Sequence, residues 1–412
     1  MLECFKGRLR VLSFLFFGGL LSGLIFIGLC STLPFMLAER KVSPSEIATI
    51  LMATLPYSWK FVLSPFINNI IIKYADAKFD IIKVLSLLFH AIIIVCFASI
   101  GGYSDSGSLI ALNLTILAVS VAVAANDIVF SYVKLLLFKK EELGPVVSII
   151  NSGFRIGIFL SGAVMLYIAE AKGWRVAFTV ISLITLACSV AALILPRTRY
   201  SDEHQKQTTS SVKDYLRSLR DFFSRKKVGL FLMTMLSFKF TDSCISTMKP
   251  VFLQSIGMSK ITFANVTHVI GLFVMIISGL IAGACAQKFS TIKCMRYTFI
   301  MQCIPALLFT IVSCVHVELL VLAIVINIST IIFSFSNVVF RTYAAEESSG
   351  DVNIFVLIIS LSSLYRIIST KLGGMIADVG SWPMMFMMCL VSNIPGLIAY
   401  RRILKAHSSQ GR

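Results

Sequence analysis

The sequence DIVFSY at residues 127–132 has a counterpart in NVVFRTY at residues 337–343. A second pair follows downstream, with GFRI at residues 153–156 and LYRI at residues 364–367, and both pairs are separated by about 210 residues. Chance alone would rarely produce two such pairs at one common offset. The repeats therefore predict a chain built from two related halves.

The segments around these repeats are too apolar for a soluble protein. Hydrophobic residues make up 57% of the 412 residues and charged residues 14%, with a mean hydropathy of +0.88, whereas a soluble domain carries about 25% charged residues. A membrane-spanning helix needs roughly 20 apolar residues. Runs of this kind predict about twelve transmembrane helices. They lie near residues 11–37, 46–72, 82–102, 108–138, 144–169, 174–195, 228–256, 261–287, 293–315, 317–345, 351–378 and 382–400.

Basic residues gather in alternate connections between these helices. Short cytoplasmic loops retain Lys and Arg, whereas translocated loops avoid them. With the N-terminus inside, the basic clusters at residues 6–10, 73–83, 134–140, 288–296 and 401–405 all fall on one side. We therefore expect both termini in the cytoplasm. We attribute the net charge of +17 to this topology and to contact with anionic lipid headgroups, and we expect no nucleic-acid partner.

A polar stretch at residues 196–227 divides the chain near its midpoint. We therefore expect an N-terminal six-helix half at residues 1–195, a cytoplasmic linker at 196–227 and a C-terminal six-helix half at 228–412. This pattern predicts an all-α membrane protein with the major facilitator fold, whose pseudo-symmetric halves are related by an axis along the membrane normal. The linker predicts either an amphipathic helix on the membrane surface or a simple charged connection. The apolar face of that helix would comprise Val212, Tyr215, Leu216, Leu219, Phe222 and Phe223.

Ionisable residues inside apolar segments are candidates for function, because the bilayer makes them unfavourable. Asp127 is the only acid deep in the first half. A proton-coupled carrier needs a carboxylate that can gain and lose its proton during the cycle. We therefore predict that Asp127 couples transport to protons and that Arg155, on the next helix, is its partner. The alternative is a static Asp127–Arg155 clamp that only joins two helices.

The other polar residues in the predicted helices are candidates for binding an anionic substrate, because the cations outnumber the acids. Lys60 lies between Pro56 and Pro65, which allow a bend into a cavity, and a lysine that snorkels to the interface is the alternative. Lys239 and Asp242 stand three residues apart on one helix face, where a purely structural pair is the alternative. The predicted binding set also contains Asn126, Asn337 and Arg366.

Several further residues are assigned no direct role in transport. Lys249 and Lys371 lie nearer helix ends, which predicts snorkelling, and His90 and His268 are single histidines for which packing is predicted. The chain has no CxxC pair, no nucleotide-binding glycine loop and no nucleophile triad. We therefore expect no metal, no cofactor and no enzymatic activity, and a non-transporting membrane sensor is kept as an alternative function.

Segments along nearly the whole chain resemble those of one known family, the AmpG-type muropeptide permeases of the major facilitator superfamily. In that family the corresponding patterns look like YxxKFxWxP, QDIxxDAYR, GYRxGxxxSG followed by GWR, and YKxxD. The matching segments here are PYSWKFVLSPF (56–66), NDIVFSY (126–132), NSGFRIGIFLSGA (151–163) with GWRVAF (173–178), and FKFTDS (238–243).

This resemblance implies proton-driven import of anhydro-muropeptides or related amino-sugar cell-wall fragments. It also implies a monomer in the bacterial inner membrane, with transport from periplasm to cytoplasm. The chain departs from the family at Ser131, where a second acid is usual, and at Lys134, where an arginine is usual. A carrier of another anionic metabolite, such as a nucleotide-like or acyl-CoA-like compound, is therefore the alternative. The polar set implied by the resemblance comprises Lys60, Asp127, Arg155, Lys239 and Asp242.

Overall fold

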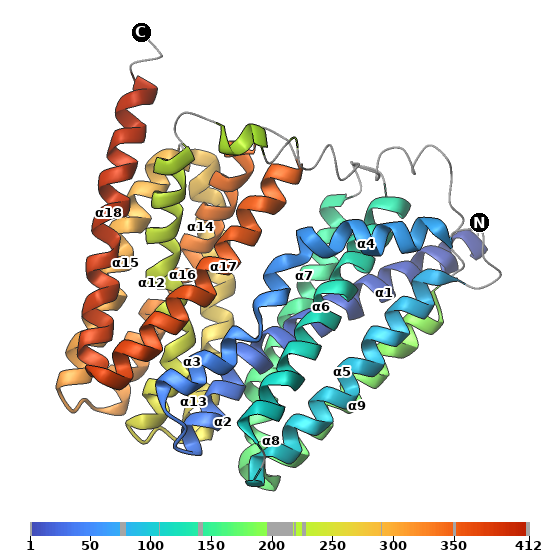
Figure 1. Cartoon of the computed structure of the whole chain (residues 1–412), viewed down its shortest axis with the longest axis horizontal. Helices are drawn as coiled ribbons and strands as arrows, with labels where there is room; N and C mark the ends of the chain where they lie inside the picture. The colour runs from blue at the N-terminus through green and yellow to red at the C-terminus, as the bar shows by residue number, and fades with distance from the viewer. Residues whose placement is uncertain are drawn as a thin grey trace. The chain divides into compact units, whose positions relative to one another are not determined.

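The described part of the chain is helical, with no strand among its residues (Figure 1). In this computed structural model, it comprises residues 2–74, 80–106, 108–138, 143–195, 217, 220–224, 228–289, 291–348 and 352–408. Ten helices within these residues are long and apolar enough to cross a membrane, and a bent pair makes an eleventh span. Helix α17 (Val352–Val379), with 28 residues, also exceeds the roughly 20 that a span needs. The predicted all-α membrane fold is confirmed.

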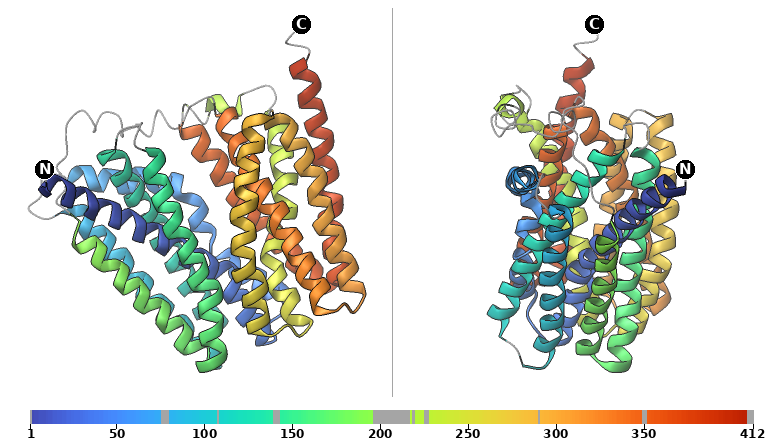
Figure 2. Two further views of the ribbon diagram at one scale, coloured as in Figure 1. Left: turned by 180° about the vertical axis from the view of Figure 1, so that it is seen from behind. Right: turned by 90° about the vertical axis from the view of Figure 1, so that its right-hand side faces the viewer.

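The chain divides into two compact units, of which the first comprises residues 1–36 and 53–213. Its segments of membrane-spanning length follow the predicted apolar runs to within several residues. Within this unit α5 and α9 lie side by side along their length (Figure 1 and Figure 2). Its elements are α1 (Leu2–Ile27), η1 (Gly28–Thr32), the start of α2 (Leu33–Glu39), η2 (Leu55–Trp59), α4 (Lys60–Lys73), α5 (Ile81–Ser106), α6 (Leu109–Leu137), α7 (Leu143–Phe159), η4 (Leu160–Val164), α8 (Met165–Lys172) and α9 (Trp174–Leu193).

Glycines hold α1 and α7 against each other. A Cβ atom on Gly19 would collide with the carbonyl oxygen of Ile150, and one on Gly157 would collide with that of Leu20. Gly19 and Gly23 on α1, and Gly153 and Gly157 on α7, each follow the G-x-x-x-G spacing that lets membrane helices approach closely. The π-helical turns η1 and η4 continue this contact, where Thr32 Oγ1 donates to the Ser161 carbonyl at 2.8 Å.

The second predicted span is broken. Helix α3 (Pro44–Met52) is followed by the 3-10 turn η2 and, after a break, by α4, and Pro56 lies at the start of η2. A proline lacks the N–H group of a regular helix, so a bend at this place is favoured. This confirms the bend predicted between Pro56 and Pro65. Lys60 begins α4 directly after the break.

The second unit comprises residues 37–52 and 214–412. Residues 37–52 thus belong to it, although the sequence pattern predicts them in the N-terminal half. Helix α3 packs on α17, and the Ser43–Glu46 capping box begins α3, with Glu46 N donating to Ser43 Oγ at 3.3 Å. The other elements are α12 (Val228–Ser255), α13 (Lys260–Phe263), η5 (Ala264–Ile270), α14 (Gly271–Lys288), α15 (Thr291–Cys314), α16 (Leu319–Glu347), α17 and α18 (Trp382–Ser408).

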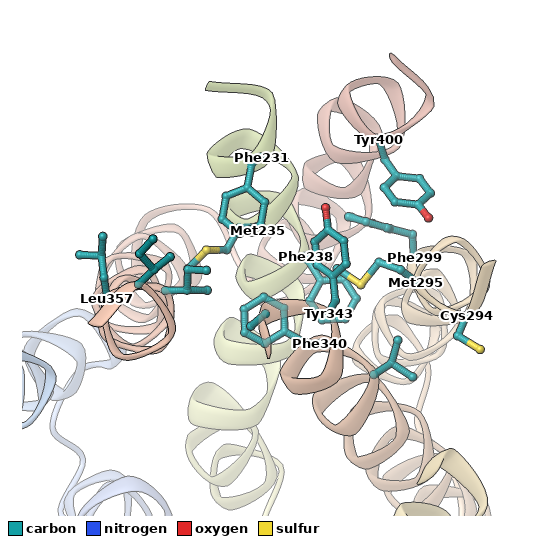
Figure 3. Packing of buried hydrophobic residues seen from close by; sticks show 14 of the residues in the cluster. Phe231, Met235, Phe238, Cys294, Met295, Phe299, Phe340, Tyr343, Leu357 and Tyr400 are labelled. Carbon is teal, nitrogen blue, oxygen red and sulfur yellow. The ribbon is translucent and has the colours of Figure 1, made fainter. Parts of the chain in front are cut away.

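A cluster of aromatic residues forms the core of this unit (Figure 3). Phe238 of α12 stacks on Phe340 of α16 with ring centroids 5.6 Å apart. Phe222, from the predicted linker, packs edge-on against Phe231 at 5.9 Å and is only 2% exposed, whereas Phe223 is 49% exposed. The two residues therefore do not share one membrane-facing surface as predicted. The other predicted face residues, Val212, Tyr215, Leu216 and Leu219, lie outside the described residues.

Candidate functional site

In the first unit, an ion pair joins Lys60 of α4 to Asp127 of α6. The Lys60 ammonium donates to Asp127 Oδ2, and the Ser22 hydroxyl of α1 donates to Asp127 Oδ1 at 2.7 Å. The Lys60 ammonium also lies 3.7 Å from the centre of the Tyr57 ring, an arrangement that favours a cation. We call Ser22, Tyr57, Lys60 and Asp127 the first-unit polar cluster. It draws together three segments that are distant in sequence.

The break in the second span explains how Lys60 reaches Asp127. Tyr57 lies in the 3-10 turn η2 and Lys60 opens α4, so both side chains come from the bend itself, and both η2 and α4 pack on α6. The side chain of Lys60 is 30% exposed and that of Asp127 is 15% exposed. The pair is therefore largely sheltered by protein and still partly exposed, as a site that exchanges protons or ligands requires.

Arg155 is not the cation that pairs with Asp127, so this predicted pairing is wrong. Among the described residues, Asp127 forms its ion pair with Lys60, and Arg155 lies half-buried on α7 with no ion pair. The reason is the packing: α7 lies along α1, held there by glycines, and not along α6. Helices that follow one another in sequence need not be neighbours in a bundle.

In the second unit, Lys239 and Asp242 of α12 contact Asn337 of α16. Lys239 Nζ donates to Asp242 Oδ2 at 3.2 Å and also to Asn337 Oδ1. Asn337 Nδ2 donates to Asp242 Oδ2 at 3.1 Å, and Ser246 Oγ donates to Asp242 Oδ1 at 3.4 Å. We call Lys239, Asp242, Ser246 and Asn337 the second-unit polar cluster. The predicted Lys239–Asp242 pair thus forms, as part of a larger network.

The aromatic core supports this network from one side. The Lys239 ammonium lies 4.7 Å from the centre of the Phe340 ring, and Phe340 in turn stacks on Phe238 (Figure 3). Phe340 is three residues beyond Asn337 on α16, so the ring and the amide project from the same helix face. Lys239 is consequently held between an amide oxygen, a carboxylate and a ring face.

The two clusters occupy corresponding places in their units. Helices α6 and α16 both contain 29 residues, and they begin at Leu109 and Leu319. Asp127 and Asn337 are therefore both the nineteenth residue of their helices. Each accepts a hydrogen bond from the first long helix of its own unit, through Ser22 or Lys239. This common register supports the duplication that the repeats predict.

The remaining predicted residues lie in different surroundings. Asn126 is buried, and its Oδ1 atom has no hydrogen-bond partner within the described residues. Arg366 is half-buried on α17. Lys371 donates to Thr49 Oγ1 of α3 instead of simply reaching toward an interface. Snorkelling is wrong for Lys249, which is only 9% exposed and lies six residues before the end of α12.

Both single histidines are buried and contact neighbouring residues. His90 Nδ1 lies 3.1 Å from Ser189 Oγ of α9, and the His268 ring packs edge-on against Phe263 at 5.4 Å. Among the described residues, no group of three His, Cys, Asp or Glu side chains is placed to hold a metal ion. The charged groups that meet in the two polar clusters are lysines and aspartates.

Sequence reasoning missed two members of the first-unit polar cluster. Tyr57 could have been suspected, because it precedes Lys60 by one helical turn. Ser22 gave no such signal, because a serine within a long apolar helix is ordinary. What identifies it is its 2.7 Å hydrogen bond to Asp127.

Comparisons with known proteins agree with this architecture. The sequence model of the Major Facilitator Superfamily matches residues 15–363. The Putative transporter AmpG 3 of Rickettsia prowazekii is 24% identical over 379 residues, which cover 90% of each chain. The Anhydromuropeptide permease of Escherichia coli K12 is 22% identical over 388 residues, covering 91% of this chain and 78% of that protein.

Solved structures show the same fold. The nucleoside transporter NupG has a TM-score of 0.69 and 14% identity, with 97% of this chain and 98% of the other covered. The xylose transporter XylE of E. coli has a TM-score of 0.68 and 14% identity, with coverages of 96% and 97%. The duplicated helical units, the membrane-embedded ion pairs and a family match over most of the chain lead to one conclusion. The protein is a member of the Major Facilitator Superfamily and is a transporter.

Proposed function

We propose that this transporter imports anhydro-muropeptides or related amino-sugar cell-wall fragments across the bacterial inner membrane together with protons. The relatives named as AmpG transporters and as an anhydromuropeptide permease support this substrate class. The cation-rich set of membrane residues supports an anionic substrate, because Lys60, Arg155, Lys239 and Arg366 stand against the two acids Asp127 and Asp242. We further propose that it acts as a monomer, because one chain supplies both units, and that its termini lie in the cytoplasm, the side on which the basic loops gather.

The ion pair between Lys60 and Asp127 is the observation that supports coupling of substrate transport to protons. When Asp127 is ionised, it holds the Lys60 ammonium and competes with any substrate anion. Protonation removes the negative charge of Asp127 and frees Lys60 to bind an anionic group of the substrate. Proton binding to Asp127 and substrate binding to Lys60 then favour each other, as thermodynamic linkage requires. Release of the proton restores the ion pair and expels the anion.

The second-unit polar cluster would orient the substrate. Lys239 is fixed by three neighbours, so it offers a cation in a defined position without a search over rotamers. Arg366 is close enough to Lys239 to interact electrostatically, which keeps this region positive even though Asp242 is present. Asn337, where the first unit has an acid, adds no negative charge. In this proposal the first unit exchanges a proton for an anionic group of the substrate, and the second unit holds the substrate without titrating.

Uptake by purified protein in proteoliposomes tests the proposal. Anhydro-muropeptide should accumulate when an inward proton gradient is imposed, and it should only equilibrate when the gradient is dissipated by a protonophore. A carrier of another anionic metabolite is the second candidate, since the cation excess favours that class equally. Nucleotides and acyl-CoA compounds should therefore be tried as competitors. If one of these compounds inhibits uptake or is itself accumulated while anhydro-muropeptide is not transported, that compound's class replaces muropeptides as the proposed substrate.

A further inference from the structure

Lys249 is a buried cation with no bonded counter-ion among the described residues. It lies on α12, is 9% exposed, and makes no hydrogen bond or ion pair within the described residues. A lysine ammonium inside a membrane-spanning helix is unfavourable unless an anion or water compensates it. The mechanism proposed above does not use this residue. Its position therefore calls for an anionic partner.

The neighbouring groups do not supply that anion. Asp242 lies on the same face of α12, seven residues earlier, and is close enough for electrostatic interaction with Lys249. Both of its carboxylate oxygens are already bonded, Oδ2 to Lys239 and Asn337 and Oδ1 to Ser246. Among the described residues, His268 on η5 is also within electrostatic range of Lys249, but it is neutral or positive and cannot act as a counter-ion.

The surface beside Lys249 is open and polar. Ser246 lies between Asp242 and Lys249 on this helix face, and it is exposed although its neighbours along α12 are buried. Pro250 follows Lys249 within the helix, and a proline leaves the carbonyl four residues earlier, that of Ser246, without its helical N–H donor. Free carbonyls within a membrane helix are tolerated where they face protein or a water-filled cavity. A polar ligand can therefore approach this face.

The spacing along α12 sets the length of that ligand. Lys239 and Lys249 are ten residues apart, which corresponds to about 15 Å at the rise of an α-helix. A single sugar ring cannot span two cations at this separation. A glycan that carries a peptide can, because its terminal carboxylate lies far from its sugar.

We propose that Lys249 is a specificity-determining residue that binds the terminal carboxylate of an elongated substrate, about 15 Å of helix rise beyond Lys239. This inference rests on the proposed function for the identity of the substrate as a glycan-peptide. It adds a second anchoring point, which selects substrates by their length and by a charge at the far end. Sugars without a peptide would bind at the second-unit polar cluster alone.

A comparison of two ligands on matched variants tests the role of Lys249. The ligands are an anhydro-muropeptide with a free C-terminal carboxylate and the same compound with a C-terminal amide. Their dissociation constants are measured for the purified wild-type protein, for Lys249→Met and Lys249→Arg, and for the control Lys371→Met. Lys371 is also a membrane lysine, bonded to Thr49, and it has no place in the proposed binding set.

In the wild-type protein, amidation should weaken binding roughly tenfold to a hundredfold, the range expected for a hydrogen bond between charged groups. Lys249→Met should lose this preference and bind both ligands as the wild type binds the amide. Lys249→Arg should keep part of the preference, and Lys371→Met should keep all of it. Replacement of a buried charge by an apolar side chain of similar length should also leave the protein folded, as its melting temperature will show.

Two results would overturn the inference in distinguishable ways. If the wild-type protein binds both ligands equally, or if Lys249→Met keeps the wild-type preference, the role of Lys249 is refuted while the proposed substrate class stands. If the wild-type protein binds neither ligand, the proposed substrate class is refuted and the role of Lys249 falls with it. If Lys249→Met fails to fold, Lys249→Arg decides the first case, because an undiminished preference in that variant also refutes the role of Lys249.

Discussion

Replacement of Asp127 by asparagine should separate substrate binding from proton coupling. The amide of the substituted side chain would keep an oxygen that can accept from Ser22, and it would imitate a carboxyl that is permanently protonated. Lys60 would lose its ionic partner and stay available for the substrate anion. We therefore expect binding to be retained, and exchange of external for internal substrate to continue, while accumulation against a gradient is lost.

The size of the effect follows from the single acid in the first-unit polar cluster. One carboxylate carries one proton per cycle, so a gradient of one pH unit supports at most about tenfold accumulation of the substrate. For Asp127→Asn the ratio of internal to external substrate should fall to about one. Loss of the charged hydrogen bond should also lower the free energy of unfolding, by about 1.5–3 kcal/mol at most because both side chains are partly exposed.

The assay is uptake of labelled anhydro-muropeptide by proteoliposomes, with the steady-state ratio measured at imposed pH differences of zero and one unit. Glu39→Gln is the matched control, because Glu39 also pairs with a lysine, Lys260 at 2.6 Å, at the end of a helix. It should accumulate substrate as the wild type does. A tenfold ratio in Asp127→Asn would show that the Lys60–Asp127 pair is only a clamp between α4 and α6.

Three other predictions concern the cations and the helix contact. Lys60→Met should weaken substrate binding and also change the pH profile of uptake, because Lys60 is the ionic partner of Asp127. Arg155→Ala should leave the pH profile unchanged. Equal pH profiles for the two variants would contradict the assignment of Lys60 as that partner. Arg366→Ala should raise the apparent KM for substrate more than it alters the pH dependence, as measured by uptake between pH 5.5 and 8 in roughly half-unit steps. Gly157→Val should destabilise the protein by about 1–3 kcal/mol or more. Gly102→Val should not, because a Cβ atom added to Gly102 meets no atom within 4 Å. Thermal unfolding in detergent measures the stability of both variants.

Most of the fold could be predicted, because the bilayer sets the length of each apolar run. The helix ends could not, since α1 begins at Leu2 and α18 continues to Ser408, beyond the apolar stretches. Hydropathy reports where a helix meets lipid and not where its hydrogen bonds stop. The repeats predicted that Asp127 and Asn337 correspond, and both stand at the same position in helices of equal length.

The contacts within the site were less predictable than its members. Arg155 was chosen as a partner from its place on the following helix, but the glycines of α7 direct that helix against α1. Lys60 reaches Asp127 from the start of α4, directly after the 3-10 turn η2, and both elements pack on α6. Lys249 was judged by its distance from a predicted helix end, which says nothing about the neighbours that cover a side chain. In each case the missing information is which helices are neighbours, and the sequence does not encode this locally.

The glycine contact between α1 and α7 has a consequence for motion. Backbone meets backbone there, so no rotamer change can relieve or reshape the contact. In the second unit, Gly373 of α17 meets the sulfur-bearing side chains of Cys244 and Met248 on α12, which can adapt their conformations. Amide hydrogens of α1 and α7 should therefore exchange slowly whether or not substrate is bound. Those of α12 and α17 should change their exchange rates during the cycle.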